Sequence, residues 1–280
     1  MAAIAPNDWF LYGDHSPITK IEIKKMKTVN NLYDSFRGLD RLSEFICDFD
    51  QMENVVVLDH TWHLCLNLDS IPLIDTSKVI NFNNAFFGCR SLTSFPLIDT
   101  SKVTHMGAAW NYCDSLTSFP LIDTSEVIRM GSTWSNCRSL TSFPLIDTSK
   151  VTFMTATWNY CDSLTSFPLI DTSEVTSIDI AWANCQSLTS FPLIDTSKVI
   201  TMGSTWSNCK KITSFPLIDT SKVEAFGYTW ANCDLLTSFP TLDVSSGTNF
   251  YGTWSFNTPV CPRDDGSITF PVGADVGSAC

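Results

Sequence analysis

A stretch of 24 residues recurs through this chain almost without change, and this recurrence limits what the chain can fold into. Residues 91 to 114 read SLTSFPLIDTSKVTHMGAAWNYCD, and near-copies follow one another without a gap. The prolines from Pro72 to Pro240 keep the same 24-residue step, and so do the cysteines from Cys65 to Cys233. A fixed period of this length is typical of stacked supersecondary units, none of which can bury its apolar face alone. The sequence therefore predicts one solenoid and not a set of separate globular domains.

The repeat divides the chain into three expected segments. Residues 1–17 stand outside it and form either a cap or an attachment segment, because the end of a solenoid needs a changed outer face. Residues 18–256 form the solenoid, with about ten coils. Residues 257–280 break the pattern and are expected to cap the far end. Cys261 and Cys280 lie there, but their spacing alone does not establish a disulfide.

The first half of each coil has the pattern of a short strand. Leu92, Phe95 and Leu97 are the apolar positions, and Phe95 and Leu97 are expected on one face, in the core. Pro96 conflicts with this expectation, because proline cannot donate a ladder hydrogen bond. We therefore expect a very short strand, with parallel pairing over about three residues per coil.

The second half of each coil has the pattern of a short amphipathic helix. Val103, Met106, Trp110 and Cys113 recur at intervals of three, four and three residues. Ser101 stands where it can cap such a helix. Strands on one face and helices on the other make an α/β solenoid, with tryptophan and cysteine rows buried between them. The predicted core ladder comprises Trp110, Trp134, Trp158, Trp182, Trp206, Trp230, Cys113, Cys137, Cys161, Cys185 and Cys209.

The repeat pattern resembles a known family. The spacing Leu-x-x-Phe-x-Leu-x(5)-Val-x-x-Met-x(3)-Trp-x-x-Cys is that of a leucine-rich repeat, most similar to the BspA-like kind and the short repeats grouped as DUF285. The runs Cys89 to Phe95 and Asp99 to Val103 carry the resemblance. It implies a right-handed, curved solenoid with strands on the concave face and helices on the convex face. It also implies recognition roles, as in bacterial adhesins, protist surface proteins and bacteriophage structural proteins, and it brings no catalytic residues.

Charge and composition exclude several classes of partner. The formal net charge of −12 leaves no basic stripe for nucleic acid. No apolar run approaches the length of a membrane-spanning helix. The first residues lack the basic start and apolar run of a secretory signal, so we expect a cytoplasmic protein that reaches a virus particle or a cell surface by another route.

An aspartate recurs in every coil, at Asp99 and its copies, and neighbouring carboxylates repel one another unless they are compensated. One interpretation is an Asp-x-Ser turn in which each carboxylate accepts backbone N–H bonds. The other is a row of Ca²⁺ sites, which is disfavoured because calcium needs six or more oxygen ligands.

Two further rows alternate in sign from coil to coil. Lys102 is followed 24 residues later by Glu126, and Arg90 is followed by Asp114. Each exposed pair contributes only about 0.2–1 kcal/mol, but a coil displaced by one place would bring like charges together. The alternation therefore predicts that these pairs set the register between coils.

Residues with the pattern of an enzyme or a metal site are scarce. His60 and His63 are close in sequence, but no nearby carboxylate or cysteine completes a familiar ligand set. We expect a solvated or packed histidine pair, no cofactor and no metal. The sequence also lacks a glycine-rich phosphate loop, a nucleophile elbow and a zinc-protease motif, so we expect no enzymatic activity.

Differences between coils fall mainly in the expected helices, on the convex face. They predict a binding surface there, although drift on a solvated face explains them equally well. The candidate binding residues are His105, Tyr112, Arg129, Phe153, Tyr160, Ile180 and Tyr228.

The function predicted from these features is a non-enzymatic recognition or structural module, in a bacteriophage particle or a surface adhesin. Its expected partner is a protein or a host-surface glycan, and it could form a homo-oligomer within a larger assembly. The alternative is an ice-binding or other regular-array surface built from the Thr93 and Thr100 rows. A polysaccharide-acting solenoid enzyme is less favoured, because no cluster of acids interrupts the repeat.

Overall fold

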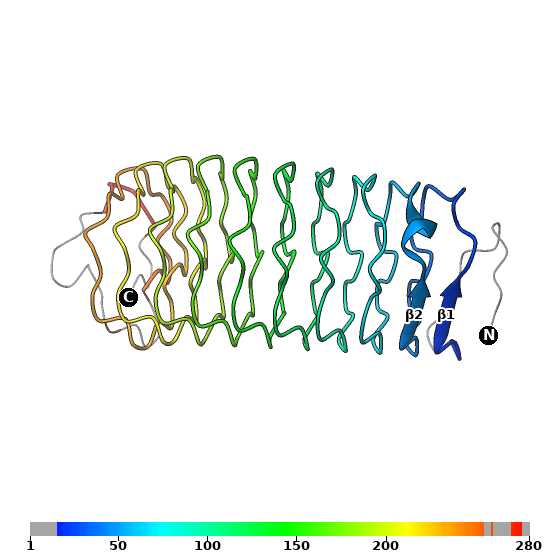
Figure 1. Cartoon of the computed structure of the whole chain (residues 1–280). Helices are drawn as coiled ribbons and strands as arrows, with labels where there is room; N and C mark the ends of the chain where they lie inside the picture. Colours follow the sequence, from blue (N-terminus) through cyan, green and yellow to red (C-terminus); the bar gives the residue numbers. More distant parts are fainter. Residues whose placement is uncertain (1–15, 255–258, 260–269, 276–280) are drawn as a thin grey trace.

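The structure, a computed structural model, describes residues 16–254, 259 and 270–275. These residues form a row of coils that succeed one another along one axis (Figure 1). A series of parallel bridges joins successive coils: Asn81 pairs with His105, His105 pairs with Arg129, and the series continues to Asp275, with an additional bridge between Ser214 and Ser238. The described residues thus form a repeat solenoid. Residues 1–15, Cys261 and Cys280 lie outside them.

The predicted helices do not form. In the described part of the chain the only helix is the 3-10 helix η1 (Phe49–Met52). The segment after Val103 is instead a series of turns, in which Ala109 N donates to Met106 O and Cys113 N donates to Trp110 O. The turn closed by Ala109 has Ala108 at its third position, with a φ of 53°, as type II turns require.

Hydrogen bonds between coils explain why turns replace the helix. Met106 N, Ala108 N and Trp110 N donate to carbonyl oxygens of the next coil at 3.2, 2.9 and 2.9 Å. This ladder holds neighbouring coils at the strand spacing of about 4.8 Å. Packed helices need about 8–10 Å between their axes, so a helix in every coil would break the ladder. The turns bury the same apolar positions, which is why the sequence pattern resembled a helix.

Strands occur only where proline is absent. β1 (Lys20–Ile23) and β2 (Glu44–Cys47) pair in parallel, with Glu22 opposite Ile46. From Pro72 onward, proline occupies the position of Glu22 and Ile46, and no described residue there belongs to a strand. The missing N–H and fixed φ of proline account for this difference.

The same proline turns one predicted core residue outward. Ile98 N donates to Pro96 O at 3.0 Å, which closes an inverse γ-turn around Leu97. Leu97 is 62% exposed, whereas Ile98 is 3% exposed. The placement of Leu97 in the core is therefore wrong, and Ile98 takes its place. In β1 and β2, which lack proline, the corresponding residues Ile23 and Cys47 are buried.

Stacked tryptophan rings occupy the centre of the coils. Trp110 and Trp134 lie 5.7 Å apart between ring centroids with an interplanar angle of 4°, and Phe119 meets Trp110 edge-on at 4.7 Å. The Cys113 thiol is also buried and donates to Phe86 O at 3.3 Å. Burial raises the pKa of such thiols, that of Cys185 to about 12. The fully buried tryptophans are Trp62, Trp110, Trp134, Trp158, Trp182, Trp206, Trp230 and Trp254.

The recurring aspartate forms the predicted turn. Asp99 Oδ1 accepts hydrogen bonds from Ser101 N at 2.9 Å and from Ser101 Oγ at 2.7 Å. These bonds, the hydroxyl first, lower the pKa of Asp99. Ser101 therefore closes a turn instead of capping a helix. Among the described residues, no group of three or more His, Cys, Asp or Glu side chains is arranged to hold a metal ion.

Opposite charges of the two rows meet at some of the predicted steps, whereas Lys102 and Glu126 form no ion pair with each other. Lys150 pairs with Glu126 of the preceding coil at 2.6 Å, and Lys198 pairs with Glu174 at 2.6 Å. In the second row, Arg90 Nε lies 3.8 Å from Asp114 Oδ2. The predicted contacts between opposite charges on neighbouring coils are confirmed for these pairs.

Candidate binding surface

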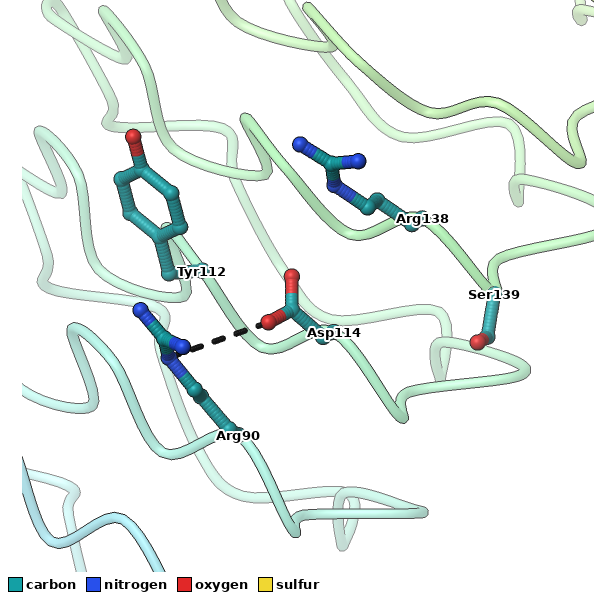
Figure 2. A pocket seen from close by; sticks show the side chains of 5 residues that line it. All are labelled: Arg90, Tyr112, Asp114, Arg138 and Ser139. Atoms are coloured by element: carbon teal, nitrogen blue, oxygen red, sulfur yellow. Dashed lines mark ion pairs between the residues drawn. The ribbon is translucent and has the colours of Figure 1, made fainter.

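A pocket of about 460 Å³ opens where the turn series of three coils meet, lined by Arg90, Tyr112, Asp114, Arg138 and Ser139. Figure 2 shows Asp114 between the two arginines, and the side chains of Arg90, Tyr112 and Arg138 extending in the same direction. Tyr112 has a φ of 61° at the third position of the turn that Cys113 N closes on Trp110 O. This turn places the tyrosine ring outside the core.

The two arginines keep most of their hydrogen-bonding capacity. The side chain of Arg90 is 60% exposed and that of Arg138 is 53% exposed. Arg90 pairs with Asp114 and Arg138 with Asp162, each at 3.8 Å, which is longer than a hydrogen bond. The guanidinium carbon of Arg90 also lies 5.9 Å from the centre of the Tyr112 ring. The donors of both arginines are therefore available to a ligand.

Asp114, which lines this pocket, exposes only part of its carboxylate. Its Oδ1 is buried and has no hydrogen-bond partner among the described residues, and the same holds for the equivalent oxygens of Asp162 and Asp234. This orphaned oxygen is therefore a feature of the repeat. The Asp114 side chain as a whole is 32% exposed, so the rest of its carboxylate is open to a ligand.

A related arrangement follows two coils later. Arg138 Cζ lies 5.3 Å from the centre of the Tyr160 ring, and Arg138 pairs with Asp162. Burial raises the pKa of Asp162, while Arg138 and a hydrogen bond with Gln186 oppose the shift. Gln186 stands where the first arrangement has its second arginine. The two arrangements thus differ by one positive charge.

A second pocket, of about 530 Å³, lies over the bridge ladder. Its lining is Asn83, His105, Gly107, Arg129, Gly131 and Phe153. The bridges join His105 to Arg129 and Arg129 to Phe153, and Arg129 Cζ lies 6.0 Å from the centre of the Phe153 ring. These three predicted binding residues are therefore neighbours on a β-bridge ladder and not on helices.

The remaining predicted residues are not brought into these pockets. Ile180 and Tyr228 occupy the position of Ala108, with φ values of 59° and 58°. The Tyr228 ring lies 5.4 Å from that of Tyr251. The sequence pattern predicts only a register role for Arg90 and Asp114 and does not connect them with Tyr112. Asp114 is two residues from Tyr112 in the same coil, and Arg90 precedes Asp114 by one 24-residue step, so the repeat period is the signal that places all three side by side.

These features define a solenoid of nearly identical coils with pockets at its variable positions. The model of the BspA type leucine rich repeat region, in six copies, matches residues 55–179 and 152–263. The chain therefore belongs to the BspA-type leucine-rich repeat family, as its repeat pattern indicated. Among curated proteins, none matches the chain.

Solved structures of bacterial leucine-rich repeat proteins resemble this one at low identity. A protein from Bacteroides ovatus is 17% identical with a TM-score of 0.49, and the match covers 83% of this chain and 66% of that one. A protein from Eubacterium ventriosum is 16% identical with a TM-score of 0.46, over 72% and 54%. A leucine rich cell surface protein from Faecalibacterium prausnitzii is 16% identical with a TM-score of 0.37, over 79% and 72%.

The chain thus spans about two thirds of the first of these proteins and about half of the second. At such identities the likeness concerns the fold alone. In the described part of the chain, no helix has the length and apolar character needed to cross a bilayer.

Proposed function

We propose that this chain is a non-enzymatic binding module that recognises a partner through the two pockets. The proposal rests on the repeat positions at which the residue changes from coil to coil. His105, Arg129 and Phe153 occupy one repeat position and line one pocket, whereas Arg90 and Arg138 flank the other. Exposed arginine and aromatic side chains are enriched where proteins bind partners. The repeated coils supply a rigid frame, and the variable residues supply recognition.

The setting of this module is a cell surface or a virus particle. Family membership and the cell-surface description of the F. prausnitzii protein support the cell-surface adhesin. The bacteriophage component stays a prediction from sequence. Copurification of the chain with cell envelopes or with virus particles distinguishes the two settings.

The ice-binding alternative receives less support. Thr100 is buried, and its hydroxyl donates to Asp123 O at 2.6 Å, so this row offers no exposed hydroxyl array. In the exposed Thr93 row, the Thr141 hydroxyl donates to Thr117 O at 3.3 Å. Absence of thermal hysteresis at high protein concentration would exclude this alternative.

Binding of the purified chain to arrays of defined glycans and purified extracellular proteins tests the proposal. We expect saturable binding to at least one member. The double variant Arg90→Gln/Arg129→Gln, which alters both pockets, should lose it. The control variant Leu121→Ala/Leu169→Ala changes exposed leucines of the repeated face and should keep it. Absence of binding to every member, or equal loss in both variants, contradicts the proposal.

A further inference from the structure

We infer that the pocket of Arg90, Tyr112, Asp114 and Arg138 binds a sugar acid, meaning a sugar ring that carries one carboxylate and free hydroxyls. This inference rests on the proposed function and names a ligand class for one of its two pockets. Three features of the pocket lead to it: the two arginines, the partly exposed aspartate carboxylate and the tyrosine ring.

The arginines require an anionic group. Arg90 and Arg138 flank Asp114, and Arg138 also lies 3.8 Å from Asp162, so each guanidinium faces a carboxylate without a hydrogen bond to it. Guanidinium groups bind carboxylates through two parallel hydrogen bonds. Both side chains are more than half exposed, and both ion pairs are too long to be hydrogen bonds. A carboxylate between the two arginines would therefore gain hydrogen bonds that Asp114 does not make.

The aspartate requires a hydroxyl on the same ligand. An ionised carboxylate only accepts hydrogen bonds, and the Asp114 side chain, which is 32% exposed, has only the 3.8 Å contact with Arg90, too long to be a hydrogen bond. A simple anion such as acetate offers no donor to this carboxylate and would be repelled by it. A cation would satisfy Asp114 but not the arginines. A ligand with a carboxylate and a neighbouring hydroxyl satisfies both.

The size of the pocket and its aromatic wall fit a sugar ring. A volume of about 460 Å³ lies within the usual range of small-molecule pockets, roughly 300–1,000 Å³. Tyr112 is 36% exposed, and its ring meets Phe87 at 5.6 Å, so it is a firm apolar wall for the carbon face of a ring.

The overall charge limits the ligand to few carboxylates. The chain carries a formal charge of −12, which repels a polyanion. At physiological salt this repulsion is screened beyond about 8 Å, so a single carboxylate held by the arginines is little affected. We therefore expect a terminal sugar acid and not a long acidic polysaccharide.

The arrangement around Tyr160 can be compared directly with the pocket around Tyr112. It repeats the arginine, tyrosine and aspartate but has Gln186 in place of the second arginine. Gln186 is neutral, so this second arrangement should bind a carboxylate more weakly. Replacing Gln186 with arginine should complete it.

Titration calorimetry of the purified chain tests the inference, with glucuronic acid and N-acetylneuraminic acid as ligands. We expect saturable binding of at least one of them to one site per chain. Glucose and acetate, which each lack one of the two groups, should bind at least about tenfold more weakly.

Arg90→Gln should weaken binding by about tenfold or more and Asp114→Asn by several-fold, because each removes a hydrogen bond to a charged group. Because Arg138 belongs to both arrangements, Gln186→Arg is tested in the Arg90→Gln background, where it should restore sugar-acid binding around Tyr160 and Asp162.

The control variant is Arg41→Gln, which removes an exposed arginine that lines neither pocket and should leave sugar-acid binding unchanged. A thermal melt of each variant verifies the fold. Equal affinity for acetate, equal loss in Arg41→Gln, or no binding of either sugar acid overturns the inference. If the sugar acids fail while array members still bind through the two pockets, only the ligand class is wrong. If array binding also fails, the proposed function is wrong.

Discussion

At the scale of single residues, the γ-turn after each proline separates two adjacent apolar side chains. Leu145 points to solvent and Ile146 into the core, and the same contrast recurs in neighbouring coils. The exposed leucines of this row are Leu73, Leu97, Leu121, Leu145, Leu169, Leu193 and Leu217.

This contrast predicts unequal effects of two neighbouring alanine substitutions. Leu145→Ala should change the free energy of unfolding by no more than about 0.5 kcal/mol, as is usual at exposed positions. Ile146→Ala should lower it by about 2–5 kcal/mol, because it leaves a cavity in the core. Urea unfolding of the two variants measures the difference. Similar losses in both would show that Leu145 is packed in solution.

His63 predicts a pH dependence of stability. Burial, followed by the charges of Arg37 and His60, lowers the pKa of His63 to about 4, and its ring stacks on Phe87 at 4.6 Å. Between about pH 6.5 and 4 the unfolded chain therefore binds a proton that the folded chain does not. The contribution of His63 to the free energy of unfolding is complete above about pH 6.5 and is lost progressively as the pH falls toward 4.

Urea unfolding across this pH range measures the effect. His63→Phe keeps an aromatic ring against Phe87 and removes the titrating group, so the fall in stability should become shallower. The matched variant Leu97→Ala, at an exposed residue that carries no titrating group, should keep the slope of the parent chain. An unchanged slope in His63→Phe would contradict the assignment.

At the scale of the element, each coil is built from turns that need positive φ at two positions. In the coil of Trp110 these are Ala108 and Tyr112. Small or turn-forming residues occupy the first position in several coils, such as Asn84 and Ser132. Among the described residues at this position Ile180 is the β-branched one, and a β-branched side chain with a φ of 59° is strained.

Ile180→Asn should therefore stabilise the chain, by about 1 kcal/mol. Asparagine tolerates positive φ and occurs naturally at the equivalent Asn84. The control is Ile200→Asn, at an exposed isoleucine without positive φ, which should bring no gain. Thermal or urea unfolding compares the two. Stabilisation of both variants would trace the effect to lost surface hydrophobicity and not to backbone strain.

At the scale of the whole molecule, the stack holds together through contacts between neighbouring coils. Stability of such a solenoid is close to a sum over coils and their interfaces. The alternating charges also favour particular pairs of neighbouring coils, those that place opposite charges side by side. Removal of residues 115–138 deletes one coil length, and it would place Lys102 beside Lys150 and Asp114 beside Asp162.

This one-coil deletion should gain stability when salt is added, because salt screens the new like-charge contacts, each worth about 0.2–1 kcal/mol. The matched deletion of residues 115–162 removes two coil lengths and brings Lys102 beside Glu174. It should lack this gain. Unfolding is measured for both deletions at low and high salt, and the change in the free energy of unfolding with salt is compared between them. Equal responses would show that the charge rows play no part in register.

The sequence by itself determined the repeat, the family, the buried tryptophan and cysteine positions and the aspartate turn. Each of these follows from a strict period, because stacking converts one position of the repeat into a row of identical contacts. It also indicated His105, Arg129 and Phe153 as variable surface residues. Apolar spacing alone could not separate a helix from a series of turns, since both bury residues at intervals of three and four.

The tertiary structure decided what depends on the distance between coils. Hydrogen bonds to the next coil hold the stack at strand spacing, which excludes the helices and converts them into turns. The proline bend then turns Leu97 outward and Ile98 inward. Stacking also brings Arg90, Tyr112 and Arg138 to one pocket, although they come from three different coils. No single copy of the repeat contains this contact, because it forms only when each coil lies against the next.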